Sequence, residues 1–477
     1  MAAGDYVVRR NNANTDTIAN AGGDLTLIWD QAVANVGSGI THSSGVFSLG
    51  ETGHFLIMYS DFIRCTHLGN ARTSWETRIN FAGADLIAGS CTGYIRGNNS
   101  LTEEFIVSGC AIVDVASTVG DGDEVFIHHL RNDGTTASPL PLRVTSRSGI
   151  SIIKLDDSWG FGIYRSSAAV AGATTNNVAT TMNIRTQDEQ DSPFTRSTDS
   201  VDIASTNTIM ALFTMRVATK STTNRSESQI RLNINSGTIE PGSWGQVYGP
   251  RHQSSIEVAA VSGMCLLYPT SGDDVTLEQL SREVGNSIAD TWEASLTLVE
   301  LPSGAESCTM EATGGLCNEA IAQTFDWDTL PHIDTAAFTA TAGNPNIDVD
   351  AADDYIVMAN QGYTSNTGGN GLTRAVPSIQ FRVQGSNNDH AGGTTYNRNS
   401  GTAEHGHMFT ATLLDGVAQN DSLEVWNDST FSQNTGTMLC ENGAFSALRL
   451  GSLFAGGGGL GIPIAAYHHN HHNLDIG

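Results

Sequence analysis

Residues 46–57 read VFSLGETGHFLI, and this stretch decides the fold. Phe47 and Leu49 lie two positions apart, Gly53 follows four positions later, and Phe55 opens a new apolar run two positions after that. The same spacing returns in Val201, Ile203, Asn207 and Ile209, and again in Ile347, Val349, Asp353 and Tyr355. Residues two apart share one face of a β-strand. We therefore predict two short strands joined by a tight turn in each copy, and one domain for each interval of about 150 residues.

Three further segments recur in the same order in every copy. Alternating strands place one apolar face at Thr77, Ile79 and Phe81, at Ile230, Leu232 and Ile234, and at Ile379, Phe381 and Val383. Acidic turns begin at Gly122, Gly272 and Asn420, and closing strands cover 151–155, 296–301 and 447–453. The pattern predicts an all-β chain of three tandem antiparallel β-sandwiches. We expect domains at 1–157, 158–302 and 303–455, followed by a Gly/His-rich tail at 456–477.

The first copy resembles the jelly-roll heads of the complement and tumour necrosis factor family. The resemblance covers most of residues 24–157 and rests on Trp29-Asp30, Asn35, Gly45-Val46-Phe47, Gly53-His54-Phe55 and Gly122-Asp123-Glu124-Val125. The other copies share only the spacing, and Asn207 and Asp353 replace the hairpin glycine. Both residue types tolerate a left-handed backbone, so we expect the turn to survive the change. The resemblance implies jelly rolls that pack as a homotrimer through an apolar seam.

One segment is compatible with two secondary structures. Leu277, Leu280, Val284 and Ile288 have the spacing of one face of a helix. The same segment overlaps the strand that the repeat predicts after the second acidic turn. The strand is the favoured interpretation.

The charge balance argues against two classes of partner. The formal net charge is −27, from 50 acidic and 23 basic residues, and the only lysines are Lys154 and Lys220. No basic patch is present to hold a phosphate backbone, so nucleic acid is not an expected partner. An anionic membrane surface would repel the chain, and no run of about 18 apolar residues could span a bilayer. The acidity suits salty water, although an ordinary acidic surface is the simpler interpretation.

The N-terminus and the cysteines bear on where the protein folds. Met1–Tyr6 lacks the basic start and apolar run of a secretory signal. A virion protein that folds in the host cytoplasm would fit, as would export without such a signal. The cysteines number seven, with no CxxC pair. We expect small core residues at Cys91, Cys110, Cys265 and Cys440. A Cys308–Cys317 disulfide across a Gly-rich loop is the less favoured alternative to free thiols.

Candidate sites are few. No nucleophile-elbow, zinc-protease or phosphate-loop motif occurs, so we expect no catalytic or cofactor-binding residue. His128 and His129 are predicted to be surface residues at a strand end. Two sets of side chains could bind a metal: His468, His469, His471 and His472 a transition metal, and Asp348, Asp350, Asp353 and Asp354 calcium. A polar packing tail and a solvated acidic turn are the simpler interpretations.

Three functions remain open. The favoured one is a non-enzymatic structural protein of a virion surface, a capsid decoration protein or fibre of a tailed phage, forming a homotrimer and contacting other capsid proteins. The second is an extracellular adhesin that binds carbohydrate or a receptor, such as host surface glycans. Its loop aromatics would be Trp159, Trp244 and Trp327. The third is an enzyme acting on polysaccharide, which needs two facing carboxylates that the sequence does not identify.

Overall fold

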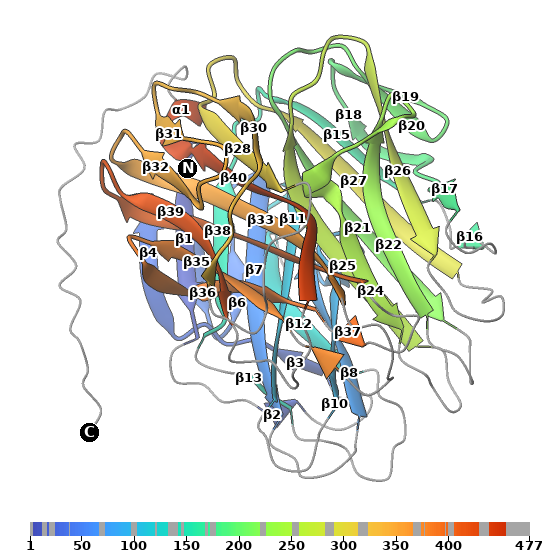
Figure 1. The fold of residues 1–477 in the computed structure, drawn as a ribbon. Helices are drawn as coiled ribbons and strands as arrows, with labels where there is room; N and C mark the ends of the chain where they lie inside the picture. The colour runs from blue at the N-terminus through green and yellow to red at the C-terminus, as the bar shows by residue number, and fades with distance from the viewer. Residues whose placement is uncertain are drawn as a thin grey trace.

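The structure, a computed structural model, is almost entirely β (Figure 1). It describes residues 3–11, 17–18, 24–37, 39–65, 72–96, 103–119, 122–131, 142–144, 147–166, 170–171, 178–219, 226–249, 257–281, 291–312, 323–365, 374–375, 377–395, 397–398, 405–428 and 438–454. Within these residues, strand pairing is antiparallel throughout and divides the chain into three successive β-sandwiches. The expectation of an all-β chain of three tandem jelly-roll sandwiches is confirmed. We call the sandwiches the first, second and third roll.

Each roll has two sheets, an inner sheet that faces the other rolls and an outer sheet. In the first roll the inner sheet contains β1 (Tyr6–Arg10), β2 (Thr17–Ile18), β4 (Gln31–Val36), β7 (Gly53–Cys65), β11 (Glu103–Val115), β13 (Leu142–Val144) and β14 (Gly149–Lys154). Its outer sheet contains β3 (Asp24–Thr26), β5 (Thr41–Ser43), β6 (Val46–Ser48), β8 (Arg72–Phe81), β9 (Ala84–Asp85), β10 (Cys91–Arg96) and β12 (Glu124–Arg131).

The second roll repeats this plan. Its inner sheet contains β15 (Gly160–Arg165), β16 (Val170–Ala171), β18 (Thr186–Gln190), β21 (Ile209–Thr219), β25 (Glu257–Leu267) and β27 (Thr291–Glu300). Its outer sheet contains β17 (Ala179–Thr181), β19 (Phe194–Ser197), β20 (Ser200–Ile203), β22 (Ser226–Ile234), β23 (Thr238–Ile239), β24 (Gly245–Gly249) and β26 (Asp273–Ser281). A single 3₁₀ turn, η1 (Pro241–Ser243), precedes β24.

The third roll follows the same order. Its inner sheet contains β28 (Ser307–Ala312), β30 (Thr329–Ile333), β33 (Asp353–Ser365), β38 (His405–Val417) and β40 (Met438–Arg449). Its outer sheet contains β29 (Gln323–Thr324), β31 (Phe338–Ala340), β32 (Asn346–Val349), β35 (Ser378–Val383), β36 (Ser386–Thr394) and β39 (Ser422–Asp428). A small ribbon of β34 (Arg374–Ala375) and β37 (Asn397–Arg398) and the short helix α1 (Leu450–Leu453) complete the described part.

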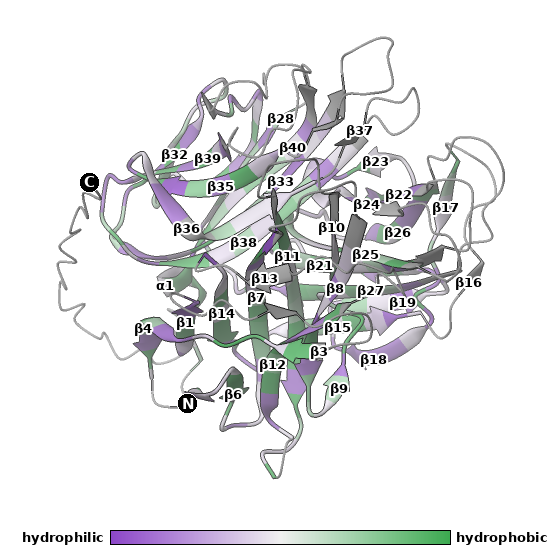
Figure 2. Ribbon diagram, turned by 90° about the horizontal axis from the view of Figure 1, so that it is seen from below, coloured by the Kyte–Doolittle hydropathy of each residue, from purple (hydrophilic) through white to green (hydrophobic). Residues whose placement is uncertain are grey.

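The repeated spacing of the sequence supplies the core of each roll. All nine apolar residues of the pattern have no exposed surface: Phe47, Leu49, Phe55, Val201, Ile203, Ile209, Ile347, Val349 and Tyr355. Every second residue of these strands enters its own sandwich, as alternation requires. In Figure 2 the inner-sheet strands β7 and β14 are mainly hydrophobic, because both of their faces are buried, and the edge strand β18 is mainly hydrophilic.

The two strands of the repeated pattern do not pair with each other, so the predicted hairpin is wrong: β6, β20 and β32 lie in the outer sheets, and β7, β21 and β33 lie in the inner sheets. The pattern marks the place where the chain crosses from one sheet of a sandwich to the other, and the glycine position of this crossover differs between the rolls. Gly53 has φ +108°, a backbone conformation that favours glycine, and a Cβ there would lie 2.1 Å from Lys154 Nζ. Asn207 and Asp353 are not among the described non-glycine residues with positive φ, so the expected left-handed backbone at these positions is wrong. Asn207 instead donates from Nδ2 to Glu300 Oε1 at 2.9 Å, and Asp353 Oδ2 accepts from an arginine of β40. In the second and third rolls, side-chain hydrogen bonds of Asn207 and Asp353 therefore stand where the first roll has a glycine with positive φ.

The ambiguous segment after the second acidic turn is a strand as far as residue 281. Leu277 and Leu280 lie in β26, which pairs with β17, β20 and β22. Neighbouring strands on both edges satisfy its backbone groups, which outweighs the helical spacing of its side chains. Val284 and Ile288 lie outside the described residues.

Candidate functional site at the junctions between the rolls

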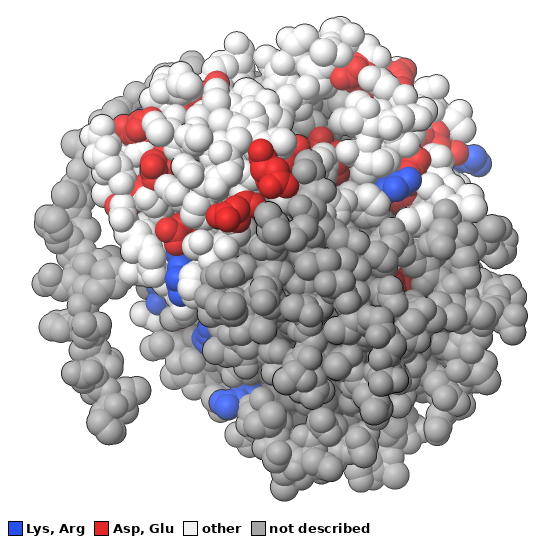
Figure 3. Space-filling model, in the orientation of Figure 1, with Lys and Arg blue, Asp and Glu red and all other residues white. Residues whose placement is uncertain are grey.

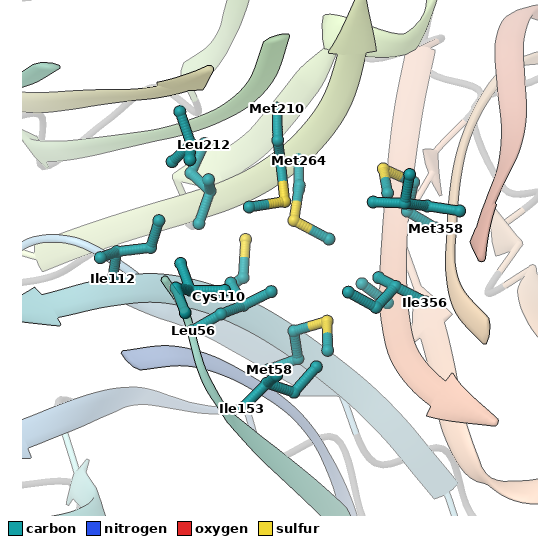
Figure 4. Close-up of a cluster of buried hydrophobic side chains, with 14 of the residues drawn as sticks. Leu56, Met58, Cys110, Ile112, Ile153, Met210, Leu212, Met264, Ile356 and Met358 are labelled. Atoms are coloured by element: carbon teal, nitrogen blue, oxygen red, sulfur yellow. The ribbon is translucent and has the colours of Figure 1, made fainter. Parts of the chain in front are cut away.

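The three inner sheets meet in one buried apolar cluster, which we call the seam. Equivalent positions of β7, β21 and β33 contribute Leu56 and Met58, Met210 and Leu212, and Ile356 and Met358. The strands beside them contribute the cross-strand partners Ile112 and Cys110, Leu266 and Met264, and Leu413 and Ala411. Figure 4 shows the side chains from β7, β21 and β33 converging from three directions. The seam therefore has an approximate threefold axis inside a single chain.

This finding bears on the homotrimer that the family resemblance implies. The apolar seam expected between three copies of a jelly roll is formed here by the three rolls of one chain. Each fully buried side chain of this size contributes about 1.5–3 kcal/mol relative to an exposed one. A homotrimer of the whole chain would therefore have to use other surfaces.

A buried polar layer next to the seam repeats the threefold arrangement. Ser60, Thr214 and Asn360 occupy equivalent positions and are at most 1% exposed. Ser60 Oγ accepts from Gly392 N of the third roll at 3.3 Å, and Thr214 Oγ1 accepts from Gly89 N of the first roll at 3.0 Å. Asn360 Nδ2 donates to the carbonyl oxygen of Trp244 in the second roll. Each roll thus bonds to the roll before it in a closed cycle.

A second ring of contacts runs around the same axis. Thr92 Oγ1 of the first roll accepts from Ala260 N of the second at 2.7 Å, and Thr394 Oγ1 of the third roll accepts from Ile106 N of the first at 3.2 Å. At the remaining junction, Gln246 Oε1 of the second roll lies 3.4 Å from His407 Nδ1 of the third. Strands β10, β24 and β36 therefore each pack on the next roll, which is the head-to-tail contact of a ring.

The outer ends of the three junctions carry different chemistry. Tyr6 of the first roll donates its hydroxyl to Asp354 Oδ2 of the third at 2.7 Å. Phe161 of the second roll stacks on His54 of the first, with centroids 3.7 Å apart. Tyr268 Oη of the second roll lies 2.6 Å from Thr309 Oγ1 of the third. If the rolls packed in a different order, the polar groups of these three contacts would be buried without partners. The three different contacts therefore favour one order of the rolls around the ring.

His54 is the centre of the most polar junction. Its Nδ1 lies 3.1 Å from Asp157 Oδ1, and its Nε2 lies 2.8 Å from Glu189 Oε2 of the second roll. Lys154 Nζ donates to both Asp157 oxygens, at 3.0 and 2.8 Å, and these hydrogen bonds lower the pKa of Asp157 despite its partial burial, which acts to raise it. Ligand atoms of His54, Asp114 and Glu189 lie within 4.8 Å of one another. This set of side chains could hold a metal ion.

Two carboxyl groups face the junction of the second and third rolls. Burial, together with the charge of Glu311, raises the pKa of Glu240 to about 8. Burial also raises the pKa of Glu311. Both groups act on the buried thiol of Cys265, whose pKa is raised first by its own burial.

The predicted calcium ligands each have a separate partner. Asp348 Oδ1 accepts from Asn346 Nδ2 and Ser422 Oγ, and Asp350 Oδ2 accepts from Thr339 Oγ1 at 2.9 Å. Asp353 pairs with Arg449 and Asp354 with Tyr6. Among the described residues, only His54, Asp114 and Glu189 form a group with metal-ligand spacing. The structure does not bring the four aspartates together, and His468, His469, His471 and His472 lie outside the described residues.

The loop aromatics expected of an adhesin are buried. Trp327 has no exposed surface, and Trp159 and Trp244 are 7% and 9% exposed. Trp159 stacks on Phe454, and Trp244 stacks on His407. In both pairs the tryptophan lies within residues 158–302 and its partner belongs to the third roll. All three tryptophan side chains pack inside the protein, so none presents an exposed ring face on which a sugar could stack.

The two adjacent histidines of β12 are separated by the strand alternation. His128 is half-buried and its Nδ1 lies 3.0 Å from Asp85 Oδ1. His129 has no exposed surface, and its Nε2 lies 2.9 Å from the equally buried Asp61 Oδ2. The expected surface position is wrong for His129, because successive residues of a strand point to opposite faces.

Several junction residues were not identified from the sequence. Ser60, Thr214 and Asn360 each lie 13 residues after the first apolar residue of the repeated pattern, so a polar residue inside three equivalent apolar runs was the available signal. His54 lies within the opening stretch itself. No local pattern marks Asp114 or Glu189.

The described surface is acidic and the described helices are short. Asp and Glu side chains outnumber Lys and Arg over the described part of the face in Figure 3. In the part of the chain that the structure describes, no helix is long and apolar enough to cross a membrane.

Comparison with known proteins adds little to these observations. No family model matches the sequence, and a search of curated proteins finds no match. The crystal structure of murine APRIL matches with 12% identity and a TM-score of 0.22, over 30% of this chain and 100% of that one. The globular domain of zebrafish complement 1qA matches with 13% identity and a TM-score of 0.21, over 33% and 100%. An archaeal virus protein described by its triple jelly-roll fold and turret assembly matches with 9% identity and a TM-score of 0.17, over 93% and 91%. These TM-scores are too low to indicate a function.

Proposed function

We propose that this chain is a non-enzymatic structural protein of a virion surface, a decoration protein or fibre, built from rolls at 1–157, 158–302 and 303–455. The observation that carries the proposal is the closed ring of rolls around the seam. All three inner sheets are used to hold the chain together, which leaves the outer sheets and loops to contact a particle. A preassembled block of this kind suits attachment to a larger assembly.

The adhesin is the second candidate, and one observation weakens it. Trp159, Trp244 and Trp327 were its proposed sugar-binding aromatics, and all three are buried. Stacking on a sugar needs an exposed ring face. A glycan array probed with the whole chain tests this alternative, because an adhesin would show binding to a defined sugar.

Particle association tests the favoured function directly. Antibodies against the chain would be used on particles from the source material, first after banding in a density gradient and then by immunogold electron microscopy. We expect the chain to band with particles and gold to label their outer surface. Recovery of the chain only from particle-free fractions would overturn the proposal.

The oligomeric state is a separate part of the proposal. Light scattering on purified protein will give the mass in solution. A trimer would fit the expectation from the family resemblance and would have to form through outer surfaces. A single chain would mean that the ring of rolls is the complete threefold unit.

A further inference from the structure

The junction of the first and second rolls contains a set of nitrogen and oxygen donors that the proposed function does not use. His54 begins β7, Asp114 lies near the end of β11, and Glu189 lies on the edge strand β18 of the second roll. We propose that His54 Nε2 and the carboxylates of Asp114 and Glu189 bind one divalent transition cation of the zinc class, which links the two rolls. The three donor atoms lie within 4.8 Å of one another.

The imidazole of His54 is held in the orientation that such a ligand needs. His54 is 7% exposed, and its ring stacks on Phe161 with 9° between the planes. Asp157 Oδ1 lies 3.1 Å from Nδ1 and accepts from the backbone N of His54 at 3.0 Å. Metal-bound histidines commonly use their second nitrogen in this way, because a carboxylate there fixes the ring and its tautomer. Nε2 is left facing Glu189.

The donor set selects the class of cation. One imidazole nitrogen and two carboxylates match zinc, which is bound by nitrogen and oxygen at about 2.0–2.2 Å. Calcium takes about 6–8 oxygen ligands, which this junction does not offer among the described residues. The two carboxylates balance the charge of a divalent ion, and because Asp114 is exposed, water can reach the fourth position.

The other two junctions provide an internal comparison. The positions equivalent to His54 are Thr208 and Asp354, and those equivalent to Asp114 are Tyr268 and Asp415. No second group with metal-ligand spacing occurs among the described residues. We therefore expect one such ion per chain, at the first junction only.

The experiment must separate this site from the histidine-rich tail. The full chain would be prepared with His468, His469, His471 and His472 replaced by alanine, and Glu189→Gln and Asp114→Asn would each be made in that background. Asp202→Asn, which changes an exposed carboxylate on β20 of the second roll, is the matched control. Zinc chloride would be titrated by calorimetry, and the thermal midpoint would be read with and without zinc.

We expect one zinc equivalent for the tail variant and for Asp202→Asn, with a higher thermal midpoint in zinc. Glu189→Gln and Asp114→Asn should each weaken zinc binding by at least about 10-fold and abolish the zinc-dependent rise. Asp157→Asn, a change in a positioning residue, should lower zinc affinity by about 10–100-fold. Because Asp157 also pairs with the buried Lys154, the variant's midpoint in zinc would be compared with its own zinc-free midpoint.

Two results would overturn the site. One is a tail variant that takes up no zinc. The other is zinc binding by Glu189→Gln and Asp114→Asn that equals that of Asp202→Asn. Because Asp114 is exposed, its substitution is not expected to impair folding. The comparison of Asp114→Asn with Asp202→Asn therefore remains valid even if Glu189→Gln fails to fold.

Discussion

The hydroxyl of Tyr6 donates to Asp354 Oδ2 at 2.7 Å, and these two residues are 348 positions apart in the chain. The contact closes the ring of rolls between the third roll and the first. Short connections join the other two junctions, at 155–159 and 301–306, but no connection links the third roll back to the first. Noncovalent contacts alone hold that junction.

Replacing Tyr6 by phenylalanine should weaken ring closure. The change keeps the ring but leaves the half-buried Asp354 carboxylate without its hydroxyl donor, and burial already raises the pKa of Asp354. We expect a loss of about 1–3 kcal/mol in the free energy of unfolding, measured in urea. Tyr164→Phe is the control, since the Tyr164 hydroxyl bond to Gln190 is 3.4 Å long and lies inside the second roll. Equal losses for the two variants would contradict the closing role of Tyr6.

Leu212→Ala tests the seam itself. Leu212 is 3% exposed and lies among side chains from all three rolls, which cannot collapse fully into the space left behind. The free energy of unfolding should fall by about 2–5 kcal/mol in chemical denaturation. Val178→Ala, at a side chain that is 49% exposed, should change it by no more than about 0.5 kcal/mol. A small effect at Leu212 would mean that the rolls do not depend on the seam.

Glu240 should make stability fall with rising pH. Its pKa is about 8 in the folded chain, mainly through burial and then through the charge of Glu311, against an ordinary value of 4.5. Between these values the folded state binds a proton that the unfolded state has lost, so its contribution is complete below about pH 4.5 and disappears as pH rises through 8.

Thermal midpoints between pH 5 and 8.5 measure this dependence. The decline should be smaller in Glu240→Gln, whose amide does not ionise. Glu278→Gln is a comparison at a carboxylate that is paired with Arg231. An unchanged pH profile in Glu240→Gln would show that Glu240 is not the group responsible.

The buried cysteines should be unreactive in the native protein. Cys91, Cys110, Cys265 and Cys308 are free and buried, and burial raises the pKa of each thiol, to about 12 for Cys91 and Cys308. The thiolate is the reactive form. A thiol reagent at pH 8 should therefore modify at most three of the seven cysteines before unfolding and all seven in denaturant. Modification of a fourth residue in the native chain would contradict the burial of these thiols.

Local sequence patterns were sufficient for the strands and for the core of each roll. Phe47, Val201 and Ile347 are all fully buried, as their shared spacing predicts. The burial of Cys91, Cys110 and Cys265 was also predicted and is confirmed. Cys308 is free, while Cys317 lies outside the described residues. The error at His129 was local, because alternation along β12 turns it to the face opposite that of His128, and there it lies against the buried Asp61.

The sequence by itself determined the β class, the threefold repetition and the inward-facing positions, because alternation with a period of two is a property of neighbouring residues. Only the tertiary structure decided that the rolls close on one another. The contacts that do this, such as Tyr6 with Asp354 and His54 with Glu189, join strands of different rolls. Their geometry depends on how whole sheets pack, and no local pattern encodes the distance between two side chains that come from separate sandwiches.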